Sequence, residues 1–234
     1  METVDFRRIG LEEGARVLDI GCGEGRHTLA AHVREASLAV GIDSDGGALR
    51  TARERAVPFH RSDPARLPRW IESSSNALPF SDGSFDFVLV CEVLEHLPEI
   101  DPTLREAHRV LRRSGRLAVS VPRFFPEWVC WKLSPAYHRT PGGHVRIFRE
   151  SELRAALIRH GFRIRARHWA HAWHAPYWWL KCLWWDRPER SRVLRAYHRF
   201  LLWDLMKRPA LSRWLERRLD PLLGKSLVLY AERT

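Results

Sequence analysis

A glycine-rich turn that follows an acidic residue near the start of the chain offers the clearest chemistry in the sequence. It reads Asp19-Ile20-Gly21-Cys22-Gly23-Glu24-Gly25. Glycine permits a tight turn and lets the backbone approach a ligand closely. The Asp19 carboxylate can meet a cation there, whereas a bound pyrophosphate would need a helix N-terminus without a nearby carboxylate. The turn therefore favours a ligand with an ammonium group over a dinucleotide.

A second acidic residue, Asp43, ends another short apolar run roughly twenty residues later, at the spacing where an acidic residue contacts a ribose. We expect its carboxylate to accept hydrogen bonds from both ribose hydroxyls, and we include the neighbouring Ser44 in the predicted site. The ligand indicated by the two carboxylates carries both an ammonium group and a ribose.

Apolar runs of strand length alternate with helical patterns along the chain, which is typical of βαβ units around a parallel sheet. The predicted strands cover residues 16–20, 38–42, 57–59, 84–90, 115–121, 162–167 and 226–231, and the predicted helices cover 26–34, 47–55, 101–111, 149–160 and 190–208. Asp19 and Asp43 then both lie at the carboxyl ends of strands, where open α/β sheets bind their ligands.

Four segments resemble, in order and spacing, the class I S-adenosylmethionine (SAM) dependent methyltransferases. They are Val17 to Gly25, Gly41-Ile42-Asp43, Ala77 to Asp86, and Cys91-Glu92-Val93-Leu94-Glu95-His96. Within that class they are similar to the type 11 methyltransferase domain, to which ubiquinone and menaquinone biosynthesis enzymes are related. The resemblance covers roughly residues 10–121 and 144–168. It implies an α/β, Rossmann-like fold with a mostly parallel seven-stranded sheet, helices on both faces and a helical insert before the last strand.

The resemblance also implies roles for individual residues, with SAM as cofactor and S-adenosylhomocysteine as product. The methionine end of SAM would contact Asp19, Gly21, Cys22, Gly23 and Gly25, and its ribose would contact Asp43. Asn76 stands where the family usually has an Asp at the adenine amino group, and an amide oxygen can accept that bond without charge assistance. The other implied contacts are Ala77 and Leu78 at the adenine, and Cys91 and Glu92 at the sulfonium. The side chain of Cys91 is expected to be a small buried apolar group.

Candidate bases for an acceptor that arrives protonated are His96, His138, His144 and Tyr137. We take His96 and His144 as the catalytic candidates, since His96 lies in the family motif and His144 lies in a glycine-containing segment that could form a lid. Each ring could instead only hydrogen-bond to the backbone. His168, His171 and His174 fall three apart. A strand-to-helix transition there would separate them, so no metal site is predicted.

Two segments, 122–148 and 169–224, depart from the βα pattern and are predicted to form inserted cap or lid segments within a single domain, 1–234. We call them the cap. Its aromatic residues predict a large apolar acceptor pocket lined by Phe124, Phe125, Trp128, Trp131, Trp173 and Tyr177. Segment 169–224 also predicts basic amphipathic helices with apolar stripes: Leu194, Tyr197, Leu201 and Leu205, then Leu211, Trp214, Leu215 and Leu219. These helices could contact a membrane surface or pack as a lid alone.

The net charge of +11 favours an anionic partner, although it could equally reflect a coding bias toward Arg. Four scattered cysteines without a CxxC pair, and a charged N-terminal segment, predict a cytoplasmic protein, with membrane association through 169–224 as an option. No uncharged apolar run reaches the length of a membrane span.

We therefore expect a SAM-dependent methyltransferase that transfers a methyl group to a lipophilic or aromatic small-molecule acceptor, by O- or C-methylation. One alternative is a non-catalytic SAM-binding protein associated with a membrane. Another is an RNA methyltransferase. The charge favours it, but no Pro-Pro-Tyr motif follows residue 91, so a nucleic-acid partner is not expected.

Overall fold

One seven-stranded sheet forms the centre of the computed structural model, which describes residues 2–34, 36–59, 67–140, 142–186 and 191–234. The strand order is β3-β2-β1-β4-β5-β7-β6. The strands are β1 (Arg16–Ile20), β2 (Leu38–Asp43), β3 (Arg69–Glu72), β4 (Phe85–Cys91), β5 (Leu111–Pro122), β6 (Phe162–Ala170) and β7 (Ser226–Arg233). β7 runs antiparallel to β5 and β6, and the other neighbouring pairs are parallel. This confirms the predicted mostly parallel sheet.

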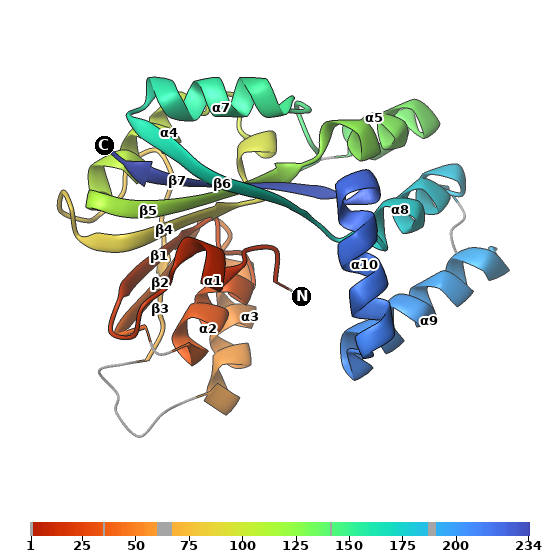
Figure 1. Cartoon of the computed structure of the whole chain (residues 1–234), viewed down its shortest axis with the longest axis horizontal. Helices are drawn as coiled ribbons and strands as arrows, with labels where there is room; N and C mark the ends of the chain where they lie inside the picture. The colour runs from red at the N-terminus through yellow and green to blue at the C-terminus, as the bar shows by residue number, and fades with distance from the viewer. Residues whose placement is uncertain (1, 35, 60–66, 141, 187–190) are drawn as a thin grey trace.

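Helices cover both faces of the sheet (Figure 1). Alternate residues of a strand point to opposite faces. Leu18 therefore packs with Leu104 of α4 (Asp101–Val110) and Leu153 of α7 (Glu150–Arg159). Val17 packs on the other face with Phe6 of α1 (Phe6–Ile9) and with α2 (Arg26–Val33). α3 (Gly46–Ala56) contacts β2 and β3, and the Asp45 side chain caps its first turn. The helices thus fix the strand ends that carry Asp19 and Asp43.

The predicted third strand at residues 57–59 is wrong. Val57–Phe59 forms a single 3-10 turn, η1, that continues α3. Pro58 cannot donate a ladder hydrogen bond, which disfavours a strand there. The strand paired with β2 is β3, whose Trp70 and Ile71 stand opposite Gly41 and Ile42.

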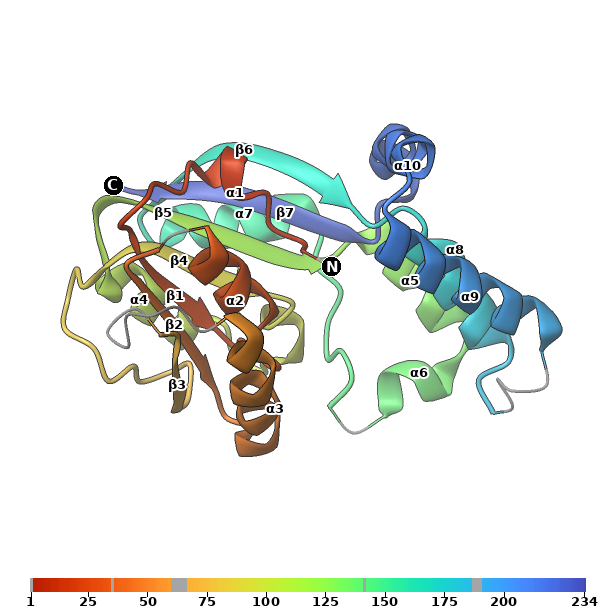
Figure 2. The ribbon, with the colours of Figure 1, turned by 90° about the horizontal axis from the view of Figure 1, so that it is seen from below.

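The two cap segments pack on each other beyond one end of the sheet (Figure 2). Segment 122–148 contains α5 (Phe124–Leu133) and α6 (Pro135–Arg139), and segment 169–224 contains α8 (His174–Leu183), α9 (Arg192–Lys207) and α10 (Ala210–Leu223). Nε1 of Trp179 in α8 donates a hydrogen bond to the carbonyl of Pro126 in α5 at 3.0 Å. Residues far apart in sequence therefore pack together beyond the end of the sheet.

The last helix of the cap buries polar residues and exposes apolar ones. Ser212 and Glu216 are buried in α10, whereas Leu211, Trp214 and Leu215 of its predicted stripe are exposed. In α9 the stripe is divided, with Leu194 and Leu201 buried and Leu205 exposed. Within the described residues no helix combines the length and the apolar character needed to cross a membrane.

Candidate functional site

Three glycines give the turn after β1 its shape. Gly21, Gly23 and Gly25 adopt left-handed conformations with φ of +68°, +52° and +81°. A Cβ at Gly21 would lie 2.4 Å from Cγ2 of Val93, so that glycine permits a close packing contact. A Cβ at Gly23 would meet nothing within 4 Å, so its backbone faces open space. The turn therefore leaves room for a ligand against the Gly23 backbone.

Asp19 is a buried carboxylate with one oxygen free. Its Oδ2 accepts hydrogen bonds from the backbone N of Thr28 at 3.0 Å and from its hydroxyl at 2.8 Å. Oδ1 is buried and has no partner among the described residues. Burial raises the pKa of Asp19 from 3.8 to about 7, although the Thr28 hydrogen bonds oppose the shift. A cationic ligand group would supply the missing partner, so the Asp19 carboxylate fits the ammonium group of SAM.

Asp43 lies directly beside the glycine turn. Its Oδ2 accepts a hydrogen bond from the backbone N of Gly23 at 2.7 Å, and its Oδ1 accepts one from the backbone N of Asp45 at 2.9 Å. These bonds fix the carboxylate, and each oxygen keeps a lone pair for a ribose hydroxyl. Ser44 follows it on the surface, and Cys22 is buried with its backbone N bonded to the carbonyl of Ile42. The structure thus brings together the predicted methionine and ribose contacts.

The predicted adenine contacts follow β3 at the same edge of the sheet. The backbone N of Ser73 donates to the carbonyl of Asp43 at 3.0 Å, which places this segment alongside the end of β2. Oδ1 of Asn76 accepts a hydrogen bond from the Thr103 hydroxyl at 2.9 Å. Ala77 is exposed, while Leu78 is buried in the core. The Asn76 oxygen also accepts a long hydrogen bond from the Ser75 hydroxyl at 3.5 Å, so an adenine amino group would compete with that bond.

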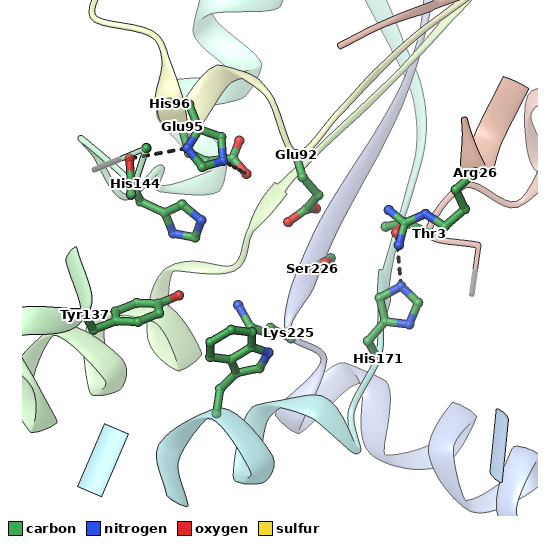
Figure 3. A pocket seen from close by; sticks show the side chains of 13 residues that line it. Thr3, Arg26, Glu92, Glu95, His96, Tyr137, His144, His171, Lys225 and Ser226 are labelled. Carbon is green, nitrogen blue, oxygen red and sulfur yellow. Dashed lines mark hydrogen bonds and ion pairs between the residues drawn. The ribbon is translucent and has the colours of Figure 1, made fainter. Parts of the chain in front are cut away.

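A cavity of about 310 Å³ opens beside this edge, between the end of β4, the start of β7 and the cap (Figure 3). Its lining consists of Thr3, Arg26, Glu92, Glu95, His96, Tyr137, Gly142, Gly143, His144, His171, Trp178, Lys225 and Ser226. Arg26 follows the glycine turn directly and Glu92 follows β4, next to the buried Cys91. Through these two residues the cavity adjoins the region expected to hold the sulfonium.

A buried carboxylate organises the cap side of the cavity. Glu127 of α5 is 0% exposed and accepts a hydrogen bond from Nδ1 of His144 at 2.6 Å. Trp131 Nε1 and the Tyr137 hydroxyl also donate to it, and Lys225 Nζ lies 3.3 Å from its Oε2. Burial raises the pKa of Glu127, but the His144 hydrogen bond and the Lys225 charge outweigh it and lower the pKa to about 2. Glu127 is therefore ionised and fixes the orientation of His144.

His96 and Glu95 lie opposite this network, on the 3-10 turn η3 (Leu94–His96) that follows β4. The His96 and His144 rings are 4.9 Å apart, so the structure brings the two predicted bases together. The Glu95 side chain is 1% exposed and has no hydrogen-bond partner for either oxygen among the described residues. Burial and the nearby charge of Glu92 raise the pKa of Glu95 well above its usual range. The cavity is thus more polar than the sequence suggested.

The predicted apolar pocket is not the cavity that the structure describes. None of Phe124, Phe125, Trp128, Trp131, Trp173 and Tyr177 lines it, and its aromatic walls are Tyr137 and Trp178. Helix periodicity shows which residues share a face but not which face meets the sheet. Sequence reasoning also missed Glu127 and Lys225. Glu127 is an acidic residue in an otherwise apolar stretch, Phe124-Phe125-Pro126-Glu127-Trp128-Val129, and this pattern could have marked it as a buried charge.

Known proteins are similar to the part of this chain that carries the glycine turn, Asp19 and Asp43. Residues 18–119 match the model of a family described as a methyltransferase domain. The 27-O-demethylrifamycin SV methyltransferase of Amycolatopsis mediterranei is 34% identical over 109 residues, which are 47% of this chain and 39% of that protein. A ubiquinone/menaquinone biosynthesis C-methyltransferase UbiE of Rhizobium etli is 38% identical over 112 residues, 46% of this chain and 42% of that protein. The chain spans less than half the length of these curated relatives.

The likeness in fold extends over the whole chain. A SAM-dependent methyltransferase from Methanosarcina mazei superposes with a TM-score of 0.63 over 100% of this chain and 99% of its own, at 18% identity. The chain thus has the fold of the class I SAM-dependent methyltransferases. Residues 18–119 are similar to the methyltransferase-domain family, and 112 residues of the chain are similar to a UbiE enzyme.

Proposed function

We propose that the protein transfers a methyl group from SAM to a small-molecule acceptor, lipophilic or aromatic in its body, that is bound in the 310 Å³ cavity. The observation that carries this function is the position of Glu92. It follows the strand end expected to border the sulfonium, and it lines the cavity. A methyl carbon at that strand end would face an acceptor directly.

SAM, when bound, supplies a methyl carbon already activated by a sulfonium. The protein mainly has to align the acceptor and exclude water. Asp19 and Asp43 would hold the ammonium and ribose ends, and the open backbone of Gly23 would lie between them. Tyr137 and Trp178 would contact the apolar body of the acceptor, while the end formed by Glu95, His96 and His144 would receive a hydroxyl. This arrangement favours O-methylation.

The test of this function is transfer of labelled methyl groups. Purified protein is incubated with methyl-labelled SAM and a lysate of the source organism, and the products are partitioned between an organic solvent and water. We expect label in the organic phase. Label confined to the macromolecular fraction would instead support the RNA methyltransferase. Asp43→Ala should abolish transfer, while Asp82→Asn, which changes an exposed carboxylate in the surface turn before β4, should leave it unchanged.

A second proposed function is docking of the cap on an anionic membrane surface, which would give access to a lipophilic acceptor. The exposed large apolar residues of α9 and α10 support it: Val193, Leu202, Trp203, Leu205, Met206, Leu211, Trp214, Leu215 and Leu222. Arg217 and Arg218 are exposed on α10, and the Arg218 guanidinium lies 5.1 Å from the ring centre of Trp214. Exposed Trp beside Arg is typical of interfacial helices, where apolar groups enter the interface and Arg meets lipid phosphate.

Replacing Trp203 and Trp214 by Ser should weaken binding to vesicles of phosphatidylglycerol by at least about 10-fold, because each Trp would add apolar burial at the interface. Co-sedimentation with vesicles measures this. Val57→Ser removes an exposed apolar side chain outside the cap and serves as the matched control. Equal vesicle binding by the double variant and the wild-type protein would refute the docking surface. SAM binding should be unchanged in both variants.

A further inference from the structure

We propose that Glu95, His96 and His144 form a binding site for one divalent first-row transition metal ion at the wall of the acceptor cavity. One ligand atom from each of Glu95, His96 and His144 lies within 4.8 Å of the others. Glu92 lines the same cavity (Figure 3). The sequence predicted no metal site.

The hydrogen bonds of both histidines use Nδ1 and leave Nε2 of each ring free for a metal ion. Nδ1 of His144 contacts the carboxylate of Glu127 at 2.6 Å, and Nδ1 of His96 contacts the carbonyl of Gly143 at 3.3 Å. Each acceptor requires a proton on Nδ1, which leaves a lone pair on Nε2. Metal-binding histidines in proteins are usually held in this way by a carboxylate or a carbonyl. Nε2 of His96 lies 4.0 Å from Oε1 of Glu95.

The unpartnered carboxylate of Glu95 is the second, independent observation. Its side chain is 1% exposed, and both oxygens are buried without a hydrogen-bond partner among the described residues. Buried polar groups nearly always have partners, and a buried charge is paired or coordinates a metal. A cation between Glu95 and the two imidazoles would supply the partner that the described residues do not.

Glu92 adds charge and a strained backbone to the same wall. It adopts a left-handed conformation with φ of +56°, which is rare for residues other than glycine and clusters at functional sites. Its Oε1 accepts a hydrogen bond from the Ser120 hydroxyl at 2.8 Å, which orients the carboxylate. Lys225, a cation that lines the same cavity, is paired with Glu127.

A second group, His171, His174 and Glu216, has similar spacing but fewer free ligand atoms. Nε2 of His171 lies 3.1 Å from the Thr3 hydroxyl, and Glu216 lies 3.6 Å from Arg213. These partners compete with a metal ion. The group at His96 is therefore favoured, and the second group provides a matched control.

The donor set indicates the kind of ion. Two imidazole nitrogens with carboxylate oxygens suit Mn²⁺, Fe²⁺, Co²⁺ or Zn²⁺, whereas Mg²⁺ and Ca²⁺ prefer oxygen ligands throughout. The role of the ion rests on the proposed methyl transfer, but its binding does not. A cation at this wall would lower the pKa of an acceptor hydroxyl that reaches it. The proton would pass to solvent, the oxygen would form the new O–C bond, and the electron pair of the broken C–S bond would stay on sulfur.

Titration of the metal-free, full-length protein with Co²⁺ alone, followed by visible absorption and calorimetry, tests the site. We expect about one ion per chain at this cluster. Glu95→Gln and His96→Gln should weaken binding by at least about 10-fold, the usual loss even for outer-shell changes. His174→Gln should bind Co²⁺ as the wild-type protein does. Glu95→Gln is isosteric, so it should fold, which circular dichroism verifies.

Absence of Co²⁺ binding at submillimolar concentration, unchanged affinity in Glu95→Gln, or a loss confined to His174→Gln would each overturn the site. Calorimetry with SAM and the labelled-methyl assay, run on the same preparations, separate this site from the proposed function. Co²⁺ binding that depends on Glu95, in a protein without methyl transfer, supports the site and contradicts the function. Methyl transfer at full rate by metal-free protein that binds no Co²⁺ supports the function and contradicts the site.

Discussion

Asp19→Asn is expected to abolish useful SAM binding and, at the same time, to make the cofactor-free protein more stable at pH 8. The buried Oδ1 of Asp19 has no partner until a ligand ammonium reaches it. Removing one member of a buried charged pair typically costs at least about 2 kcal/mol of binding free energy, or about 30-fold in Kd. Asparagine keeps the size and can still accept the Thr28 hydrogen bonds, so only the charge is lost.

The stability gain has the opposite sign because burial raises the pKa of Asp19 from 3.8 to about 7. Between these values the folded protein binds more protons than the unfolded chain, so stability falls as pH rises through the window. Above pH 7 the wild-type protein carries the full cost of the buried charge, about 4 kcal/mol at most. The amide group of Asn lacks a partner where Oδ1 stood, which costs about 1–3 kcal/mol. We expect a net gain of about 1–3 kcal/mol at pH 8 and none near pH 4.

Urea unfolding at pH 4 and pH 8, with SAM calorimetry at pH 8, measures both effects. Asp82→Asn serves as the control, since Asp82 is exposed and its ion pair with Arg109 contributes little. A variant that bound SAM with the wild-type Kd would remove Asp19 from the cofactor site. A destabilisation at pH 8 would show that the carboxylate has a partner when SAM is absent.

Glu127→Ala is expected to destabilise the protein by about 3 kcal/mol and to reduce methyl transfer by at least about 100-fold. Glu127 accepts hydrogen bonds from His144, Trp131 and Tyr137 and pairs with Lys225. Removing one partner of a buried ion pair leaves the other charge uncompensated, which costs about 3–5 kcal/mol. Lys225 retains some exposure, so the lower value applies. His144 would lose the acceptor that fixes its ring.

The double variant Glu127→Ala with Lys225→Met separates the two consequences. Methionine removes the uncompensated ammonium but leaves His144 without its acceptor. We expect urea unfolding to show that the double variant regains at least about half of the lost stability. Methyl transfer should remain at the level of the single variant. Equal stability of the two variants would mean that Lys225 does not pair with Glu127 in solution.

The glycine turn and the two carboxylates beside it were predictable because their sequence patterns are local. The strand 16–20, the glycine turn and Asp43 fall within one βαβ unit, and the two-residue alternation of a strand puts Val17 and Leu18 on opposite faces of the sheet. The third strand was predicted at the wrong position, because Val57, Pro58 and Phe59 are apolar yet form a 3-10 turn. β3 follows after residue 66 and pairs with β2 through Trp70 and Ile71.

The polar cavity could not be predicted, because its residues come from segments that meet only in the fold. Glu95 and His96 follow β4, Glu127 lies on α5, His144 precedes α7, and Lys225 precedes β7. Sequence patterns show that α5 is rich in apolar residues, but not that Glu127 points inward among them. The packing of α5 on α8 decides that burial, and with it the orientation of His144.

The class of fold, the glycine turn and the two carboxylates expected to hold SAM follow from the sequence alone, since strand ends and turn residues act over a few neighbours. The exposure of Leu211 and Trp214 on α10, and the position of His96 and His144 on one wall of a polar cavity, depend on tertiary packing. The physical reason is the range of the forces involved. Turn and strand preferences are set by the local backbone, whereas burial, and the pairing of charges that burial demands, depend on contacts between distant segments.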